Sequence, residues 1–131
     1  MSEENVEIVR AAIERFNHAG HWDLNDVGPD FELDLSRSLG PQRGVFYGRE
    51  QAERSLRSFN SDWKSIRFEP HEFIEAGDDV VVPWTAHMVG RDGIEVQART
   101  AWTWTLRDGM IVRVCLYQDK PEALKAAGLS E

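Results

Sequence analysis

Residues able to hold a metal ion or to act as nucleophiles are few in this chain, which has four histidines and one cysteine in 131 residues. His18, His21 and Asp23 lie close together, but they flank Gly20, which we expect to end a helix. A histidine near a helix C-terminus is commonly a solvated partner of the last carbonyl groups. Catalytic zinc needs three convergent ligands on rigid elements, and this spacing does not ensure them. We therefore expect no metal site.

The other histidines and the cysteine lie in strand-like segments. Cys115 has no second cysteine to pair with, and its strand context favours a small buried hydrophobic residue. His87 alternates out of phase with Trp84, which places it on the opposite face of its strand. His71 follows a proline at a break in its strand, where we expect it to be exposed. The chain has no nucleophile elbow and no phosphate-binding glycine loop.

Carboxylates are better suited to acid–base chemistry, and Asp34 is the candidate to test first. A carboxylate at a pocket mouth can remove a proton next to a carbonyl when its neighbours keep it ionised and aimed. Glu32, Asp34 and Ser36 alternate with apolar residues, which predicts a strand over 31–36 with these polar side chains on the wetter face. An exposed carboxylate is the default there. A catalytic role requires that face to line a partly hydrated cavity.

Composition limits the classes of partner. The formal charge of -8 opposes binding to nucleic acid, which needs clustered Lys and Arg, and binding to anionic membrane surfaces. Apolar content of 41% and a length of 131 residues suit one globular domain over residues 1–131. The acidic N-terminus predicts no signal peptide, and no run reaches the ~18 apolar residues of a membrane span. We therefore expect a single cytoplasmic domain.

The elements that must position these residues are clearest between residues 79 and 114. Apolar strand patterns are separated there by the same tripeptide, Arg-Asp-Gly, at 91–93 and at 107–109. Asp-Gly between alternating runs is a strong hairpin signal, because glycine accepts the positive φ of a tight turn. The pattern predicts a long antiparallel meander with Trp84, Trp102 and Trp104 on one face, which other elements must cover.

Segments before the meander supply that cover. Apolar residues from Val6 to Phe16 recur at helical spacing, which predicts an amphipathic helix that ends at Gly20. The other predicted elements are a short helix over 22–27, a loop over 37–48, a helix over 49–62, a strand over 66–75 interrupted at Pro70, and a helix over 121–128.

Five short motifs follow one another along these elements: PDFELDLS at 29–36, YGRE at 47–50, FEPHEFIEAG at 68–77, WTLRDGMIV at 104–112 and YQDKPEAL at 117–124. Their order and spacing resemble the SnoaL-like branch of the nuclear transport factor 2 superfamily, whose fold is shared with ketosteroid isomerases. The resemblance covers essentially the whole chain. It implies an α+β, cone-shaped (cystatin-like) roll, in which a strongly bent mixed or antiparallel sheet wraps around N-terminal helices.

The resemblance also assigns roles to particular residues. Asp34 falls where the ketosteroid isomerases present their general base. Their helical tyrosine falls near Ile13, and their strand carboxylic acid falls at Trp102. Without these donors a developing enolate loses much of its stabilisation, so we do not expect ketosteroid isomerase activity. Trp102 is left as a weaker indole N–H donor, as a wall of the pocket or as a plain core residue.

Alternation predicts which side chains line the inside of the cone. The residues that should share inward faces are Trp84, Ala86 and Met88, then Thr100, Trp102 and Trp104, then Val112, Val114 and Leu116. We expect Phe16 and Phe59 to form the helical wall, Trp22 to lie near the mouth and Gln118 to lie at the rim. Such a cavity suits a flat apolar ligand, although these side chains are also numerous enough to fill it.

Three hypotheses for function remain open, because the superfamily contains both enzymes and non-catalytic binding proteins. The first is a pocket in which Asp34 performs acid–base chemistry on a small hydrophobic carbonyl or phenolic compound. The second is a protein that binds a small hydrophobic molecule without turnover, and the third is a dimeric scaffold with a filled core. None of them needs a metal or an organic cofactor. The resemblance favours a homodimer formed through the outer face of the sheet.

Overall fold

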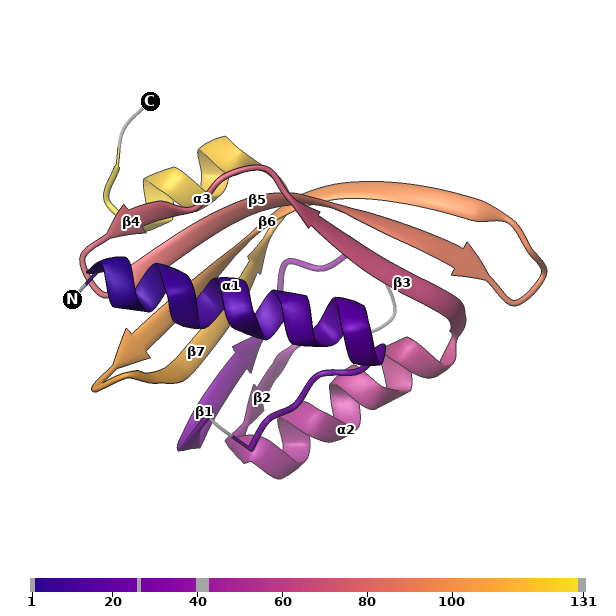
Figure 1. Ribbon diagram of the computed structural model, residues 1–131, viewed down its shortest axis with the longest axis horizontal. Coiled ribbons are helices and arrows are strands. Elements are labelled where there is room, and N and C mark those ends of the chain that lie inside the picture. Colours follow the sequence, from indigo (N-terminus) through magenta and orange to yellow (C-terminus); the bar gives the residue numbers. More distant parts are fainter. Residues whose placement is uncertain (1, 26, 40–42, 130–131) are drawn as a thin grey trace.

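The computed structural model describes residues 2–25, 27–39 and 43–129, which Figure 1 shows as a ribbon. Its helices are α1 (Ser2–Ala19), α2 (Gly48–Ser61) and α3 (Lys120–Ala126). Its strands are β1 (Val27–Asp34), β2 (Val45–Tyr47), β3 (Trp63–Pro70), β4 (Ile74–Ala76), β5 (Asp79–Gly90), β6 (Glu95–Arg107) and β7 (Met110–Tyr117). No helix within the described ranges is long and apolar enough to cross a membrane.

The strands form one mixed sheet in the order β2-β1-β7-β6-β5-β3, and β4 pairs with the start of β5. Strands β5, β6 and β7 make the predicted antiparallel meander, whereas β1 runs parallel to β7. Helices α1 and α2 pack on the concave face of the bent sheet, and α3 lies against its outer face (Figure 1). The predicted α+β cone around N-terminal helices is therefore confirmed.

The two Arg-Asp-Gly tripeptides form the turns that the sequence predicts. Gly93 has φ 89°, and Asp108 and Gly109 have φ 54° and 77°. Consecutive positive φ values match the right-handed twist of a two-stranded ribbon, which is why Asp-Gly suits this place. The side chain of Asp92 accepts a hydrogen bond from Ile94 N–H at 3.0 Å, which closes the first turn locally.

The main core lies between the concave face and the two N-terminal helices. Val9, Ile13 and Phe16 of α1 are at most 1% exposed, and they pack against a sheet face that carries Trp84 and Trp104. Burying a large apolar side chain stabilises the folded state by about 1.5–3 kcal/mol. The indole N–H of Trp84 donates to the Thr100 hydroxyl at 3.0 Å, so this buried ring has its polar atom satisfied.

A second, smaller core lies on the outer face, where α3 covers one end of the sheet. It contains Cys115, which is fully buried and confirms the prediction of a small core hydrophobe. Asp119 caps α3 by accepting a hydrogen bond from Glu122 N–H at 2.9 Å, and Pro121 lies in the first turn of the helix. The far part of the outer face, along β3, β5 and β6, is not covered by α3.

Two predictions of local elements were wrong. Residues 20–25 form an irregular segment in place of a short helix over 22–27, and β1 begins at Val27. The residues from 28 to 31 fall where the register of β1 against β7 shifts, so Pro29 is tolerated without a regular ladder partner there. The predicted loop over 37–48 contains the short strand β2, which pairs with β1.

A bulge changes the inward face of β7. The register shifts between Thr105 and Leu106 of β6, so that Leu106 faces Ile111 and Trp104 faces Val114. The prediction that Val112 shares the inward face is therefore wrong, and Ile111 takes its place in the core. One extra residue in a bulge reverses the alternation before it, and sequence periodicity alone does not show where this happens.

Candidate functional site

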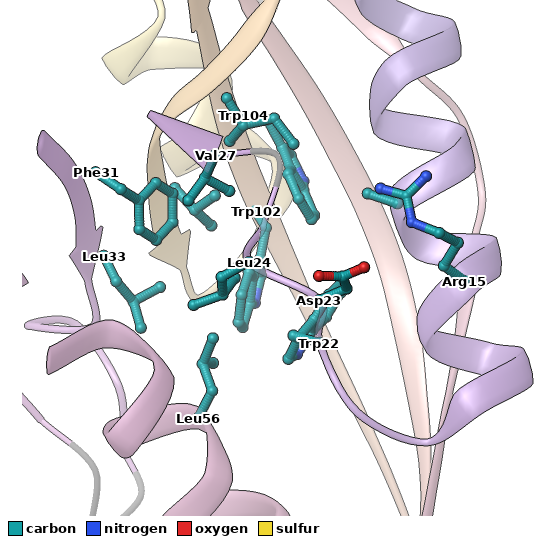
Figure 2. Close-up of a pocket in the computed structure, with 13 residues that line it drawn as sticks. Arg15, Trp22, Asp23, Leu24, Val27, Phe31, Leu33, Leu56, Trp102 and Trp104 are labelled. Carbon is teal, nitrogen blue, oxygen red and sulfur yellow. The ribbon is translucent and has the colours of Figure 1, made fainter. Parts of the chain in front are cut away.

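The concave face, the two N-terminal helices and the segment 20–25 enclose a small apolar cavity (Figure 2). Its volume is about 30 Å3. The lining consists of Ala12, Arg15, Trp22, Asp23, Leu24, Val27, Phe31, Leu33, Leu56, Trp102, Trp104, Ile111 and Val114. A cavity needs only ~10–15 Å3 to hold a water molecule, so this one admits water but no larger ligand in the conformation seen.

Trp22 is the reason that so little space remains. Its ring lies at the centre of an aromatic cluster, with centroid distances of 4.4 Å to Phe16, 5.6 Å to Phe68 and 5.8 Å to Trp104. It is also stacked on Trp102, with an angle of 22° between the ring planes at 6.5 Å. The prediction placed Trp22 near the mouth of the cone, whereas the structure inserts its side chain among the inward-facing rings (Figure 2).

Trp104 lines the cavity and carries a hydrogen-bond donor without a partner in the part of the chain that the structure describes. The residue is only 3% exposed, and its indole Nε1 has no partner among the described residues. Trp84, on the neighbouring strand, has its own N–H satisfied by Thr100. A buried donor without a partner costs about 1–3 kcal/mol, so such atoms in native proteins call for a water or ligand partner.

Two charged residues border the same cavity. Figure 2 shows the side chains of Arg15, from α1, and of Asp23, from the segment 20–25, on the side of the cavity next to α1. Both residues are exposed to solvent, and the Asp23 carboxylate accepts a hydrogen bond from Asn25 N–H at 3.0 Å. Apolar periodicity does not single out residues of this kind, so the sequence interpretation did not include Arg15 and considered Asp23 only as a metal ligand.

Asp34 lies on the other side of the sheet. Its neighbours in sequence, Leu33 and Leu35, point into the main core, and Leu33 lines the cavity. Because side chains alternate along a strand, Asp34 faces outward, opposite Cys115 of β7. Asp34 is not among the residues that line this cavity, so the condition for its catalytic role, that its face line a partly hydrated cavity, is not met here.

A network of ion pairs and hydrogen bonds holds Asp34 on this outer face. Its carboxylate accepts hydrogen bonds from Ser36 N–H at 3.0 Å, from the Ser36 hydroxyl at 2.6 Å and from the Arg113 guanidinium at 3.1 Å. Arg113 also donates to Glu32 at 3.0 Å. Burial works to raise the pKa of Asp34, but the hydrogen bonds from Ser36 and the charge of Arg113 outweigh it, and the pKa lies below its usual value.

The residues around this network are closely packed and have the properties of core residues, not of catalytic ones. Burial raises the pKa of the Cys115 thiol, which keeps it protonated and unreactive. Burial also raises the pKa of Tyr117 to about 12, and the ring of Tyr117 lies under the Arg37 guanidinium at 4.8 Å. These groups join β1, β7 and the start of α3.

The remaining predicted ligand-binding residues fall into two groups. Phe16, Trp84 and Met88 are buried in the main core behind the cavity, where they support its lining. Phe59, Leu116 and Gln118 are half-buried and do not line the cavity among the described residues. Gln118 uses its amide to donate to the Arg37 carbonyl, away from the cavity.

The histidines lie outside the cavity lining. His87 contacts Glu69 at 2.7 Å on the outer face, as alternation predicts, and the exposed His71 contacts the Thr85 hydroxyl at 2.8 Å. In residues 2–25, 27–39 and 43–129, no cluster of His, Cys, Asp and Glu side chains is arranged to hold a metal ion.

A family model described as a SnoaL-like domain matches residues 9–114, which include all strands of the sheet except the end of β7. The chain belongs to the SnoaL-like domain family. A comparison with curated protein sequences gives no match.

Solved structures share the fold of this SnoaL-like domain. TerC co-crystallised with polyporic acid is 24% identical, with a TM-score of 0.76, over 95% of this chain and 98% of that one. An NTF2-like protein of unknown function from Burkholderia pseudomallei is 23% identical, with a TM-score of 0.76, over 93% and 95%. A putative polyketide cyclase from Xanthomonas campestris is 22% identical, with a TM-score of 0.71, over 96% and 98%.

Proposed function

We propose that this SnoaL-like domain binds a small, planar hydrophobic molecule that carries an acceptor oxygen, such as a carbonyl or phenol, in the aromatic cavity of the cone. The observation that carries the proposal is the unpartnered indole N–H of Trp104, in a wall that is apolar except for Arg15 and Asp23 at its exposed side. Ligand sites are typically apolar with a few polar groups that fix orientation, and this wall has that character.

The ring system of the ligand follows from the shape of the wall. Trp102 and Trp104 present indole faces and edges, which favour offset-stacked or edge-to-face contact with another aromatic ring. An acceptor oxygen on that ring would satisfy Trp104 Nε1, a bond worth about 0.5–1.5 kcal/mol. A protein with this fold, TerC, was crystallised with polyporic acid, which supports a ligand of this general kind here.

The lining favours binding over proton transfer. Asp23 is the carboxylate among the lining residues that the structure describes, and it is exposed to solvent and engaged with Asn25 N–H. A general base is usually shielded and aimed at the proton it removes. Asp34, the base implied by the resemblance, lies on the outer face of the sheet. The geometry therefore supports a binding protein better than an acid–base enzyme.

A matched ligand pair tests the proposal. 2-Acetylnaphthalene and 2-ethylnaphthalene have nearly the same shape, but only the first has a carbonyl oxygen. We expect both to bind, measured by isothermal titration calorimetry, with the acetyl compound about 2- to 10-fold tighter, since one hydrogen bond is worth that much. The indole N–H signal of Trp104 in a 15N NMR spectrum should move downfield with the acetyl compound alone.

Trp104→Phe is the matched variant, because it keeps a ring and removes the donor. The preference for the acetyl compound should disappear in this variant, whatever its overall affinity. If neither naphthalene binds the folded wild-type protein, the proposal is wrong and the filled scaffold becomes the better description. If both bind with equal affinity, the cavity is a ligand site but Trp104 is not its donor.

A further inference from the structure

The segment 20–25 separates the internal cavity from a groove on the surface. Trp22, Asp23 and Leu24 line the cavity on their inner side. The same residues border an outer groove of about 530 Å3, whose other wall includes Arg49 and Glu53 of α2. Removal of this segment from its place would join the cavity to the groove.

Among the described residues, one long backbone hydrogen bond, from Val27 N–H of β1 to Leu24 O at 3.4 Å, joins this segment to the sheet. Gly20 N–H donates to Phe16 O at 2.7 Å, and Asn25 N–H donates to the carboxylate of Asp23 at 3.0 Å. Gly20 has φ 84°, a conformation that glycine adopts without strain, and a side chain there would meet nothing within 4 Å. The segment is irregular, and what fixes it to the interior is mainly the ring of Trp22 and the side chain of Leu24.

Trp22 differs from the other inward-facing rings in origin and in burial. Trp102 and Trp104 are held in the middle of a long central strand, whereas Trp22 comes from an irregular segment and keeps part of its surface exposed. Yet its ring is stacked on Trp102 and lies against Phe16 and Phe68, where a bound aromatic molecule would make the same contacts.

Resting on the proposed function, we infer that the Trp22 side chain occupies the place of the ligand's ring system, and that the site takes neutral bicyclic aromatic molecules by exchange with this indole. The cavity of about 30 Å3 that remains is too small for such a ligand, so binding requires Trp22 to leave. A bicyclic ring refills the space that an indole vacates. The N–H of Trp104, at the cavity wall, then meets the oxygen of the ligand.

Exchange lowers the apparent affinity of the wild-type protein, because the ligand can bind only during the fraction of time that Trp22 spends outside. The apparent dissociation constant equals the intrinsic one divided by the open fraction, and minor states are commonly populated at about 0.1–10%. Trp22→Ala removes the competing ring. We therefore expect the variant to bind 2-acetylnaphthalene at least about tenfold more tightly than wild type.

The control is Trp63→Ala, which deletes an indole that packs on Phe59 outside the cavity lining. Its affinity for 2-acetylnaphthalene should equal that of wild type. A second measurement uses the wild-type protein labelled with 5-fluorotryptophan, with the 19F signals assigned by single Trp→Phe variants. On binding, the Trp22 signal should move to the position of a solvent-exposed indole and become sensitive to the H2O/D2O ratio.

The outcomes separate this inference from the proposed function. One outcome is that the ligand binds wild type, the Trp22 signal stays in place and Trp22→Ala has unchanged affinity. In that case the inferred exchange of Trp22 with the ligand is wrong, and the proposed binding function is kept. If the ligand binds Trp22→Ala alone, Trp22 is a permanent core residue, and both proposals fail for the natural protein. If Trp22→Ala does not fold, the 19F measurement on wild type decides.

Discussion

Asp34 shows how the partners of a residue, and not its type, determine its role. The residue is 8% exposed, and its carboxylate is engaged by Ser36 and Arg113, with Arg37 at 3.9 Å. Removal of one member of such a network leaves the others without their charge partner. Because Asp34 lies on the outer face, we infer that its carboxylate contributes to the stability of the fold and not to catalysis.

Asp34→Asn should therefore destabilise the protein without changing its affinity for the ligand. We expect the free energy of unfolding to fall by about 1–3 kcal/mol, since hydrogen bonds to charged groups are worth about that much. Urea denaturation measures this loss, and Asp30→Asn, at an exposed position of the same strand, is the control. A loss of ligand affinity or of turnover at unchanged stability would return Asp34 to the functional site.

The same carboxylate makes stability depend on pH. Its pKa is lowered in the folded protein from the ordinary value of 3.8, so the unfolded state binds the proton more readily. The contribution of Asp34 is therefore fully present above the unfolded pKa and is lost as pH falls through the folded pKa. The stability difference between wild type and Asp34→Asn should be constant above about pH 5 and shrink below about pH 4. A difference that grows on acidification would contradict this.

At the scale of elements, the meander depends on its tight turns. The last turn places Gly109 at φ 77°, and a Cβ added there meets nothing within 4 Å. The cost of a side chain at this position is thus backbone strain and not a clash.

Gly109→Ala should lower the free energy of unfolding by about 1 kcal/mol through that strain. Arg107→Ala, at the exposed strand end beside the turn, should change it by less than about 0.5 kcal/mol. Thermal unfolding followed by circular dichroism measures both variants. Equal effects at the two positions would mean that the turn tolerates a side chain and does not fix the β6–β7 register.

Elements also explain which predictions succeeded. Hairpins, the long N-terminal helix and the helix near 49–62 follow from local signals, and the structure confirms them. The helix predicted over 22–27 is wrong. The irregular segment allows the Trp22 ring to pack against the rings of Phe16 and Phe68, and this packing outweighs the small stability of a helix as short as six residues. The bulge at Val112 was missed because it depends on the pairing of β7 with β6.

At the scale of the whole molecule, the outer face of β5 and β6 remains available for a partner. His87 and Arg99 lie on this part of the sheet, beyond the end covered by α3, whereas Thr85, which pairs with Arg99, is only 5% exposed and contacts His71. A polar face with mixed donors and acceptors suits a self-complementary interface of the type that a two-fold dimer requires. Homodimerisation through this face remains a prediction.

Sedimentation equilibrium tests it directly. We expect the mass of a dimer for wild type and a shift toward the 15.0 kDa monomer for Arg99→Glu, which reverses an exposed charge in the middle of the face. Arg49→Glu makes the same charge change on α2 and should leave the dimer intact. A wild-type protein that is monomeric at high concentration would exclude this interface.

The sequence by itself determined the two long helices, the antiparallel meander with its turns, and the family, because helix periodicity, strand alternation and Asp-Gly turns are local properties. The tertiary structure alone decided which face of β1 encloses the cavity, and it placed Asp34 outside. It also decided that Trp22 fills the cone and that Trp104 keeps an unpartnered N–H. A cavity is the space left after many side chains from distant segments have packed, so no local pattern specifies its volume or its occupant.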